Sequence, residues 1–139
     1  MGEPECIFCG IAAGQNEADV VYEDDISMAF LDRRPVFAGH TLLIPKAHHE
    51  TLTDLPDELV QPLFATTKRL AGALPTAIGA DGTFVAMNNK ISQSVPHLHV
   101  HVVPRRKKDG LRGFFWPRQR YRSDEERTQI AEAIRSAMS

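Results

Sequence analysis

Hydrophobic residues in the first third of the chain follow a pattern that favours β-strands. Strand-forming residues are concentrated at 20–22 and 26–31, and the acidic run at 23–25 between them suits a hairpin turn. Residues 41–44 form a short apolar run directly before Pro45, which predicts a buried strand that ends at this proline. The pattern over residues 20–45 therefore predicts three strands, the first two of which form a hairpin.

The middle of the chain has the spacing of an amphipathic helix. Leucines recur at helical intervals over 55–74, and Pro75 predicts the end of this helix because proline cannot donate a backbone hydrogen bond. A turn signal at 81–82 precedes an apolar run at 83–87. This second run predicts another strand.

The last two predicted elements are a strand and a C-terminal helix. Residues 97–103 alternate strictly between histidine and aliphatic residues and end at Pro104, as expected of a strand. Residues 123–126 form a capping box, and apolar residues follow it at helical spacing, which predicts a helix over 123–138. The order of strands and helices predicts an α+β fold with a mainly antiparallel sheet.

Composition is typical of a globular domain. The 139 residues are 42% hydrophobic and 24% charged, close to the average for such proteins. A domain of this length can bury about two-thirds of the surface of its unfolded chain, so it can fold without disulfides. The apolar runs are far shorter than the ~20 residues of a membrane helix, and the N-terminus lacks an export signal. We therefore expect a cytoplasmic protein that does not bind membranes.

Charge is unevenly distributed along the chain. The net charge is −2, which argues against a nucleic-acid-binding protein. Residues 105–122 nevertheless contain half of the 16 lysines and arginines, together with the aromatic run at 114–116. A solvated loop explains the charges, but exposed aromatic residues usually mark contacts. We expect 105–122 to be a specificity or dimer-interface segment rather than a nucleic-acid platform.

Cys6 and Cys9 form the only C-x-x-C pair of the sequence. A structural disulfide is not expected in a reducing compartment, and no strand precedes Cys6 as it would in a redox motif. Half of a tetrahedral zinc site is the better interpretation, provided that two more ligands lie elsewhere. Two free thiols without a metal are the alternative.

His97, His99 and His101 alternate along the last predicted strand and therefore share one face. Each nitrogen of a buried imidazole needs a partner, so three such residues are hard to explain as ordinary core residues. At ~3.3 Å per residue, the Cα atoms of His97 and His101 lie ~13 Å apart. One metal ion can bind a neighbouring pair but not all three, so the histidines must divide their roles.

The sequence of residues 97–103, with Pro104 and Arg105 after it, resembles the signature of the histidine triad (HIT) family of nucleotide hydrolases and transferases. Further blocks of this family occur in the usual order and spacing at residues 6–9, 22–25, 29–32 and 39–48. The resemblance covers most of the chain. It implies a single HIT domain over 1–139, with a five-stranded sheet, a long central helix and a C-terminal helix.

The resemblance implies covalent catalysis by His99. This residue would attack the α-phosphorus of a nucleotide and form a nucleotidyl-imidazole, which water or another acceptor resolves. Imidazole suits this role because its ordinary pKa, ~6.5, leaves it neutral and nucleophilic at pH 7. His101 matches the residue that contacts phosphate oxygens or the leaving group, and Ser94 is a candidate for stabilising phosphate charge.

The resemblance also implies a nucleotide substrate with AMP or GMP as the product, from a nucleoside phosphoramidate or a dinucleoside polyphosphate. Asp32 matches the position that accepts the ribose hydroxyls. The other candidate nucleotide-binding residues are Ile7, Phe8, Asn88, Gln93, Ser94, His99 and His101. The loop at 88–96 departs from the family because it lacks the glycines that let backbone approach a phosphate.

In family branches with C-x-x-C, two histidines complete the metal site, and here they correspond to His48 and His97. The resemblance therefore implies one structural Zn²⁺ per chain, bound by Cys6, Cys9, His48 and His97 with no open position. His40 is interpreted as a turn residue. The family also implies a homodimer. A nucleotide-binding interaction module with little turnover is the alternative function.

Overall fold

The computed structural model of the protein describes residues 6–111 and 118–138. It divides into two compact units, Met1–Asp109 and Gly110–Ser139, and each is described by itself. The expectation of one domain over the whole chain stays a prediction. Within the described residues, none of the helices combines the length and the hydropathy needed to span a membrane.

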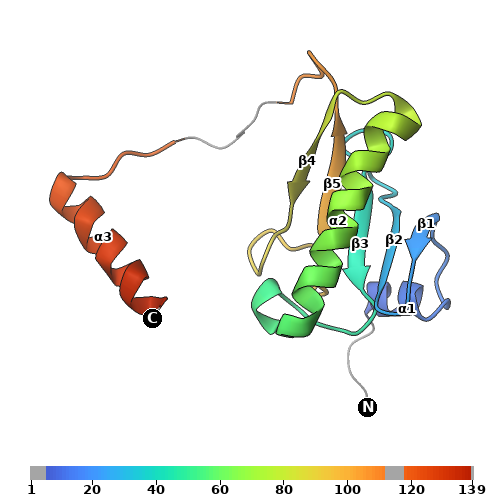
Figure 1. The fold of residues 1–139 in the computed structure, drawn as a ribbon, viewed down its shortest axis with the longest axis horizontal. Helices are drawn as coiled ribbons and strands as arrows, with labels where there is room; N and C mark the ends of the chain where they lie inside the picture. The colour runs from blue at the N-terminus through green and yellow to red at the C-terminus, as the bar shows by residue number, and fades with distance from the viewer. Residues whose placement is uncertain (1–5, 112–117, 139) are drawn as a thin grey trace. The chain divides into compact units, whose positions relative to one another are not determined.

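The first unit is built around one five-stranded sheet (Figure 1). Its elements are α1 (Ile7–Ala12), β1 (Val20–Glu23), β2 (Ser27–Leu31), β3 (Thr41–Pro45), the 3-10 helix η1 (Leu52–Asp54), α2 (Asp57–Ile78), β4 (Gly82–Ala86) and β5 (Val100–Arg105). The strand order is β1-β2-β3-β5-β4, and all neighbours are antiparallel. The predicted α+β fold with an antiparallel sheet is confirmed.

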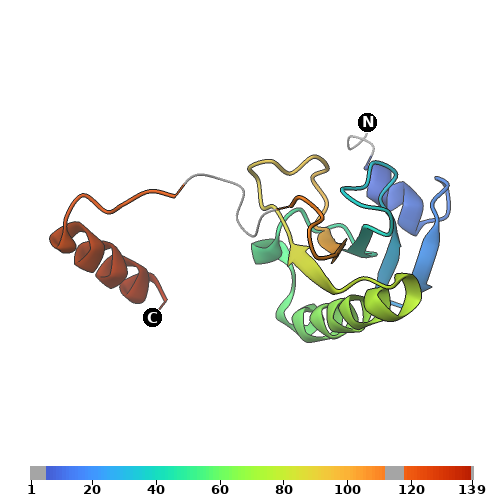
Figure 2. The same cartoon turned by 90° about the horizontal axis from the view of Figure 1, so that it is seen from above.

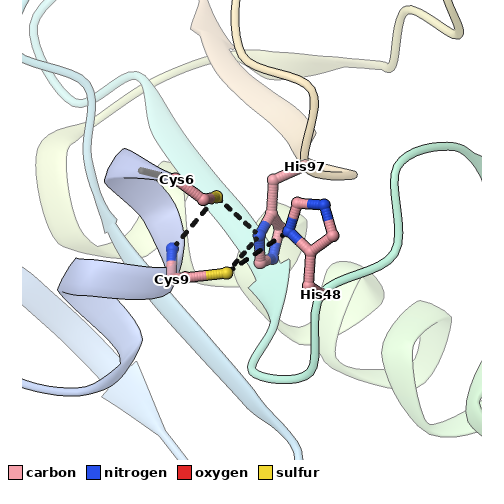
Figure 3. Close-up of side chains that lie close together, drawn as sticks. All are labelled: Cys6, Cys9, His48 and His97. Carbon is pink, nitrogen blue, oxygen red and sulfur yellow. Dashed lines mark hydrogen bonds between the residues drawn. The ribbon is translucent and has the colours of Figure 1, made fainter. Parts of the chain in front are cut away.

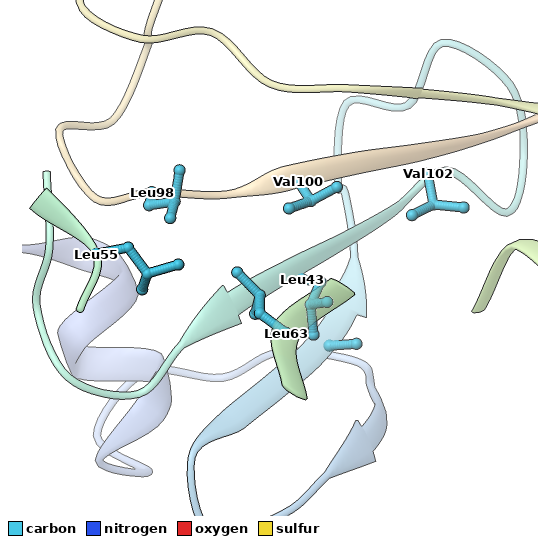
Figure 4. Packing of buried hydrophobic residues seen from close by; sticks show 7 residues of the cluster. Leu43, Leu55, Leu63, Leu98, Val100 and Val102 are labelled. Carbon is cyan, nitrogen blue, oxygen red and sulfur yellow. The ribbon is translucent and has the colours of Figure 1, made fainter. Parts of the chain in front are cut away.

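Helices cover the sheet on both faces: α2 lies on one face and α1 on the other (Figure 2). Side chains alternate along the strands and so build two cores. The core on the α2 face consists of Ala29, Leu43, Leu55, Leu63, Leu98, Val100 and Val102, most of which are seen in Figure 4. The core on the α1 face consists of Phe8, Ile11, Met28, Phe30, Leu42 and Ile44. Since Leu98, Val100 and Val102 point to α2, the histidines between them face α1.

The prediction that α2 ends at Pro75 is wrong. The helix continues to Ile78 and ends at Gly79, which has the left-handed φ of 71° and donates its N–H to the carbonyl of Pro75. Pro75 lies in the last turn, where its missing N–H removes a single helical hydrogen bond. Packing of Leu70 and Leu74 against the core of the α2 face outweighs that loss.

The prediction of a strand over 97–103 is wrong at both ends, because β5 begins at Val100 and continues through Pro104 to Arg105. Before Val100, the Leu98 N–H donates to the carbonyl of His49 instead of to a strand. Arg105 turns its carbonyl to the β4 side, where it accepts the N–H of Asp81 at 2.8 Å. Pro104 therefore faces the other side, where pairing with β3 has already ended at Val102.

The second unit contains α3 (Asp124–Ala137), which confirms the predicted C-terminal helix. The Ser123 side chain accepts the N–H of Glu126 at 3.1 Å, which is one of the two hydrogen bonds of a capping box, whereas the Glu126 side chain accepts the N–H of Arg122 at 2.9 Å. Residues 114–116 lie outside the described residues, so the interface or specificity role of 105–122 stays a prediction.

Candidate functional site

Two cysteines and two histidines from distant parts of the first unit meet at the start of α1 (Figure 3). Cys6 is the N-cap of α1, and its sulfur accepts the N–H of Cys9 at 3.3 Å. This turn brings both sulfurs to one side of the helix. His48 follows β3, and His97 precedes β5.

The spacing of these four side chains fits a tetrahedral zinc ion. The sulfur of Cys6 lies 3.3 Å from Nδ1 of His97, and the sulfur of Cys9 lies 3.3 Å from Nδ1 of His48 and 3.5 Å from Nδ1 of His97. Zinc with ordinary bond lengths separates a sulfur ligand from a nitrogen ligand by ~3.6 Å. The cluster predicted from the sequence is therefore one that can hold a metal ion.

His97 is oriented for this site by a backbone group. Its Nε2 atom lies 2.8 Å from the carbonyl oxygen of Pro45, so Nε2 carries the proton and donates it. Nδ1 is then unprotonated and faces the sulfurs. Burial lowers the pKa of His97 below 6.5, although the hydrogen bond to Pro45 opposes this shift. The ring is therefore in the neutral form that metal binding requires.

His99 is buried, with 4% of its surface exposed, and its tautomer is also set by the backbone. Nδ1 lies 2.7 Å from the carbonyl oxygen of His97 and therefore carries a proton. Nε2 keeps its lone pair and is the free nucleophilic atom of the ring. Phe8 packs edge-on against this ring with centroids 5.1 Å apart, which restrains its orientation.

His101 does not contact the metal cluster but a second buried histidine, His40. Nδ1 of His101 lies 3.0 Å from Nε2 of His40, and Nδ1 of His40 accepts the Val36 N–H at 3.0 Å. Burial lowers the pKa of His40. Burial, followed by His99 and His40, lowers the pKa of His101 to about 4, against a smaller opposing effect of Asp32.

His40 is a site residue that the sequence interpretation missed. It is 3% exposed, which does not fit a simple turn residue. Its partner lies 61 positions away, and they meet because β3 pairs with β5 in a register that places Leu42 opposite His101. The residues around Gly39 and His40 give no sign of the contact with His101. Only the order of the strands in the sheet shows that the two histidines are neighbours.

A pocket of about 940 Å³ opens beside His99 and His101, within the volume range of ligand sites. Its apolar wall includes Ile7, Phe8, Ile11, Phe30, Leu42 and Val95. Its polar groups include Asp32, Ser94, His99 and His101, and Asp32 comes directly after β2. The pocket therefore joins an apolar surface, a carboxylate and the two triad imidazoles that the metal cluster does not use.

The structure places Asn88 and Gln93 in the loop that leads to Ser94, and neither lines the pocket. Gln93 donates from Nε2 to the carbonyl of Glu50 at 2.6 Å and accepts the Lys90 N–H at 2.9 Å. Asn88 donates to the carbonyl of Ser92 at 3.1 Å. These hydrogen bonds hold the loop against the rest of the unit.

The same loop makes sharp turns without glycine. Lys90 has a φ of 74° and Ser92 a φ of 61°, both in the left-handed region that residues with a Cβ seldom adopt. Hydrogen bonds from the side chains of Asn88 and Gln93 hold these turns. Ser94 lies at the end of this restrained segment and lines the pocket.

Residues 13–108 match the family model described as HIT domain. The adenosine 5′-monophosphoramidase HNT1 of Saccharomyces cerevisiae is 41% identical over 117 residues, which cover 82% of this chain and 71% of that protein. The adenylylsulfatase HINT3 of Arabidopsis thaliana is 31% identical over 138 residues, which cover 94% of this chain and 68% of that protein.

Solved structures share this fold. A crystal structure of a HIT family member from Bacillus subtilis has a TM-score of 0.86 at 38% identity and covers 96% of each chain. A Zn-bound histidine triad family protein from Mycobacterium smegmatis has a TM-score of 0.73 at 39% identity, with 92% of this chain and 96% of that chain covered. The five-stranded sheet with its helices is thus the fold of these neighbours.

Proposed function

The chain belongs to the HIT family, and on that basis we propose that it is a nucleotide hydrolase or nucleotidyl transferase acting through His99. The substrate is a purine nucleotide conjugate, either a nucleoside phosphoramidate or a dinucleoside polyphosphate. Two relatives named as an adenosine 5′-monophosphoramidase and an adenylylsulfatase support a hydrolase of adenine nucleotide derivatives. The tautomer of His99 carries the proposal, because it leaves Nε2 free beside the pocket.

The reaction proceeds in two displacements. Nε2 of His99 attacks the α-phosphorus, a P–N bond forms, and the bond from phosphorus to the leaving group breaks. Nδ1 of His99 keeps its proton and shares it with the carbonyl of His97, which stabilises the positive charge of the ring. Water then attacks the phosphorus of the covalent intermediate, the P–N bond breaks and the nucleoside monophosphate leaves. The proton that this water loses balances the proton that the leaving group takes from solvent, so the products are the nucleoside monophosphate and the protonated leaving group. Phosphate as the acceptor gives the transferase reaction.

The other pocket residues supply binding and charge stabilisation. Asp32 accepts the ribose hydroxyls, since a carboxylate accepts two hydrogen bonds at once. Ile7 and Phe8 pack against the base. Ser94 and His101 donate to the phosphate oxygens. Asn88 and Gln93 serve this site through the loop that carries Ser94 rather than by direct contact with nucleotide.

We also propose one structural zinc ion per chain, bound by Cys6, Cys9, His48 and His97. The spacing of their donor atoms and a Zn-bound relative support this assignment. Four protein ligands leave no position for a reacting water. The ion would tie α1 to the segments after β3 and before β5, and so hold the wall of the pocket in place.

The expected homodimer and cytoplasmic location stay proposals. The sheet order leaves β4 at an edge of the sheet, and Val85 on this strand is 41% exposed. A second copy can cover such an edge by pairing strands.

A turnover assay tests the function directly. The full chain loaded with zinc is incubated with adenosine phosphoramidate and with diadenosine tetraphosphate, and AMP is measured by chromatography. Turnover by the wild type that disappears in His99→Asn supports nucleotidyl transfer through His99. Nucleotide binding without turnover of either compound would instead favour the interaction-module alternative.

A further inference from the structure

Three potential metal donors lie together apart from the zinc cluster: a carboxylate oxygen of Asp32 and one ring nitrogen each from His40 and His101. Asp32 and His101 line the pocket that contains His99, whereas His40 does not. The cluster admits two interpretations, a second metal site or a chain of hydrogen bonds. The proton positions distinguish them.

The backbone decides where His40 carries its proton. The N–H of Val36 donates to Nδ1 of His40 at 3.0 Å, so Nδ1 must be an acceptor. In a neutral imidazole the proton is then on Nε2. Nε2 is the atom that faces Asp32 and His101, and a metal ion can bind only an unprotonated nitrogen. The hydrogen bond from Val36 therefore disfavours metal binding by this cluster.

Among the described residues, the proton on Nε2 of His40 has one acceptor within hydrogen-bond distance. Nδ1 of His101 lies 3.0 Å away, whereas the nearest carboxylate oxygen of Asp32 lies 3.7 Å away, beyond hydrogen-bond distance. The other oxygen of Asp32 accepts the N–H of Arg34 at 2.9 Å. The proton of His40 is therefore directed to His101, which must accept it with the lone pair on Nδ1.

We infer that His40 is a positioning residue that holds His101 in the tautomer with its proton on Nε2, so that His101 presents a hydrogen-bond donor to the phosphoryl group or the leaving group. This inference deepens the proposed function, on which it rests for the identity of the bound group. The chain runs from the Val36 amide to His40 and from His40 to His101. The Val36 N–H donates to Nδ1 of His40, and Nε2–H of His40 donates to Nδ1 of His101.

This tautomer limits what His101 does in the reaction. A neutral imidazole with a single N–H can share that hydrogen in a hydrogen bond, but it cannot release it without becoming an imidazolate. Burial beside His40 and His99 keeps the pKa of His101 at about 4, which supports the neutral form near pH 7. His101 therefore stabilises charge on an oxygen or on the leaving group and keeps its own proton.

Nuclear magnetic resonance of the wild type tests the tautomer without any substrate. Long-range ¹H–¹⁵N correlation spectra of the zinc-loaded full chain, labelled at histidine nitrogens, are recorded at pH 7, and the His101 signals are assigned from their loss in His101→Gln. We expect an unprotonated Nδ1 and a protonated Nε2. A proton on Nδ1 of His101 would overturn the inference even if the enzyme is active. The expected tautomer without turnover would count against the proposed function alone.

Two variants at His40 test the consequence. His40→Leu removes the donor, whereas His40→Gln can place an amide N–H near the position of Nε2. We expect His40→Leu to lower kcat by about 10–100-fold with KM within a few-fold of wild type, and His40→Gln to recover most of the loss. Equal losses in both folded variants, with an unchanged His101 spectrum, would overturn the inference. Should His40→Leu fail to fold, the wild-type spectrum still decides the tautomer.

Discussion

Nε2 of His97 lies 2.8 Å from the carbonyl oxygen of Pro45, and this hydrogen bond orients the His97 ring within the cluster of Cys6, Cys9 and His48. It turns Nδ1 of His97 to the cysteine sulfurs. The backbone carbonyl of the same residue accepts the Nδ1 proton of His99 at 2.7 Å. One residue therefore contributes its side chain to the proposed zinc site and orients His99 with its backbone.

Removal of zinc should reduce stability and activity together. Without the ion, α1 loses its link to His48 and His97, and the carbonyl that orients His99 becomes less restrained. We expect a chelator to lower Tm by about 10 °C or more and to abolish turnover, and added zinc to restore both. Differential scanning fluorimetry measures Tm, metal analysis measures bound zinc, and the turnover assay measures activity.

A variant at the metal site provides the control. Cys9→Ser should start at the lowered Tm and respond little to the chelator, because its site is already weakened. Activity that disappears on chelation while Tm stays at the wild-type value would show that the metal acts in the reaction rather than in the fold.

Asp32 should contribute to binding through the ribose hydroxyls. Asp32→Asn keeps an oxygen that can accept the Arg34 N–H but removes the negative charge. The NH₂ group that replaces the other oxygen donates hydrogen bonds instead of accepting them. We expect kcat/KM for a ribonucleotide substrate to fall by about 10–100-fold, as for the loss of a hydrogen bond to a charged group. The same substrate without ribose hydroxyls should lose far less. An equal loss on both substrates would exclude the ribose as the partner of Asp32.

The sequence predicts what depends on local pattern. The continuous apolar run at Leu42 to Ile44 is sufficient for a buried strand, and the capping box at Ser123 is sufficient for the start of a helix. Local geometry also predicts that the triad divides its roles, because His97 and His101 lie too far apart to share one ion. The family resemblance, not the geometry, assigns His97 to the metal. These features need no knowledge of which strands are neighbours.

What the sequence does not predict depends on contacts between distant segments. The helix α1 has six residues and too little periodicity to detect, and its N-cap is a cysteine whose sulfur accepts a backbone N–H. The contact between His40 and His101 exists only because β3 lies beside β5. The start of β5 at Val100 likewise reflects the hydrogen bond between Leu98 and His49, which a pattern of alternating residues does not contain.

Stability should fall as the pH is lowered because His101 is held neutral in the folded state. Its pKa is about 4 when folded and ~6.5 when unfolded, so between these values the unfolded chain binds a proton that the folded chain does not. This contribution is complete above ~6.5 and is lost as the pH falls towards 4. From pH 7 to 5 we expect a loss of about 2 kcal/mol in the free energy of unfolding.

A variant isolates this effect from the other groups around it. His40, His99 and Asp32 face His101 and are present in both proteins when wild type is compared with His101→Gln. Denaturant unfolding at several pH values, with zinc saturating, should show a flatter pH dependence for the variant. Parallel curves for the two proteins would contradict a depressed pKa at His101.

The loop before Ser94 should depend on the side chain of Gln93. Gln93→Ala removes the hydrogen bonds to the Glu50 carbonyl and the Lys90 N–H, which hold the left-handed turns at Lys90 and Ser92. We expect a loss of about 1–2 kcal/mol in the free energy of unfolding and a several-fold increase in KM, because Ser94 is then less well placed. Gln93→Glu keeps the acceptor for the Lys90 N–H but points an oxygen at the Glu50 carbonyl, so it should be at least as harmful.

Lys90→Ala is the matched control for this loop. It removes the exposed ion pair between Lys90 and Glu50 but keeps the backbone N–H that Gln93 accepts. Exposed ion pairs contribute little, so we expect a change within about 0.5 kcal/mol and an unchanged KM. Chemical denaturation and steady-state kinetics of Gln93→Ala, Gln93→Glu and Lys90→Ala show whether the loop depends on the Gln93 side chain or on its backbone alone. If Gln93→Ala behaves like Lys90→Ala, the loop is held by its backbone alone and Gln93 does not position Ser94.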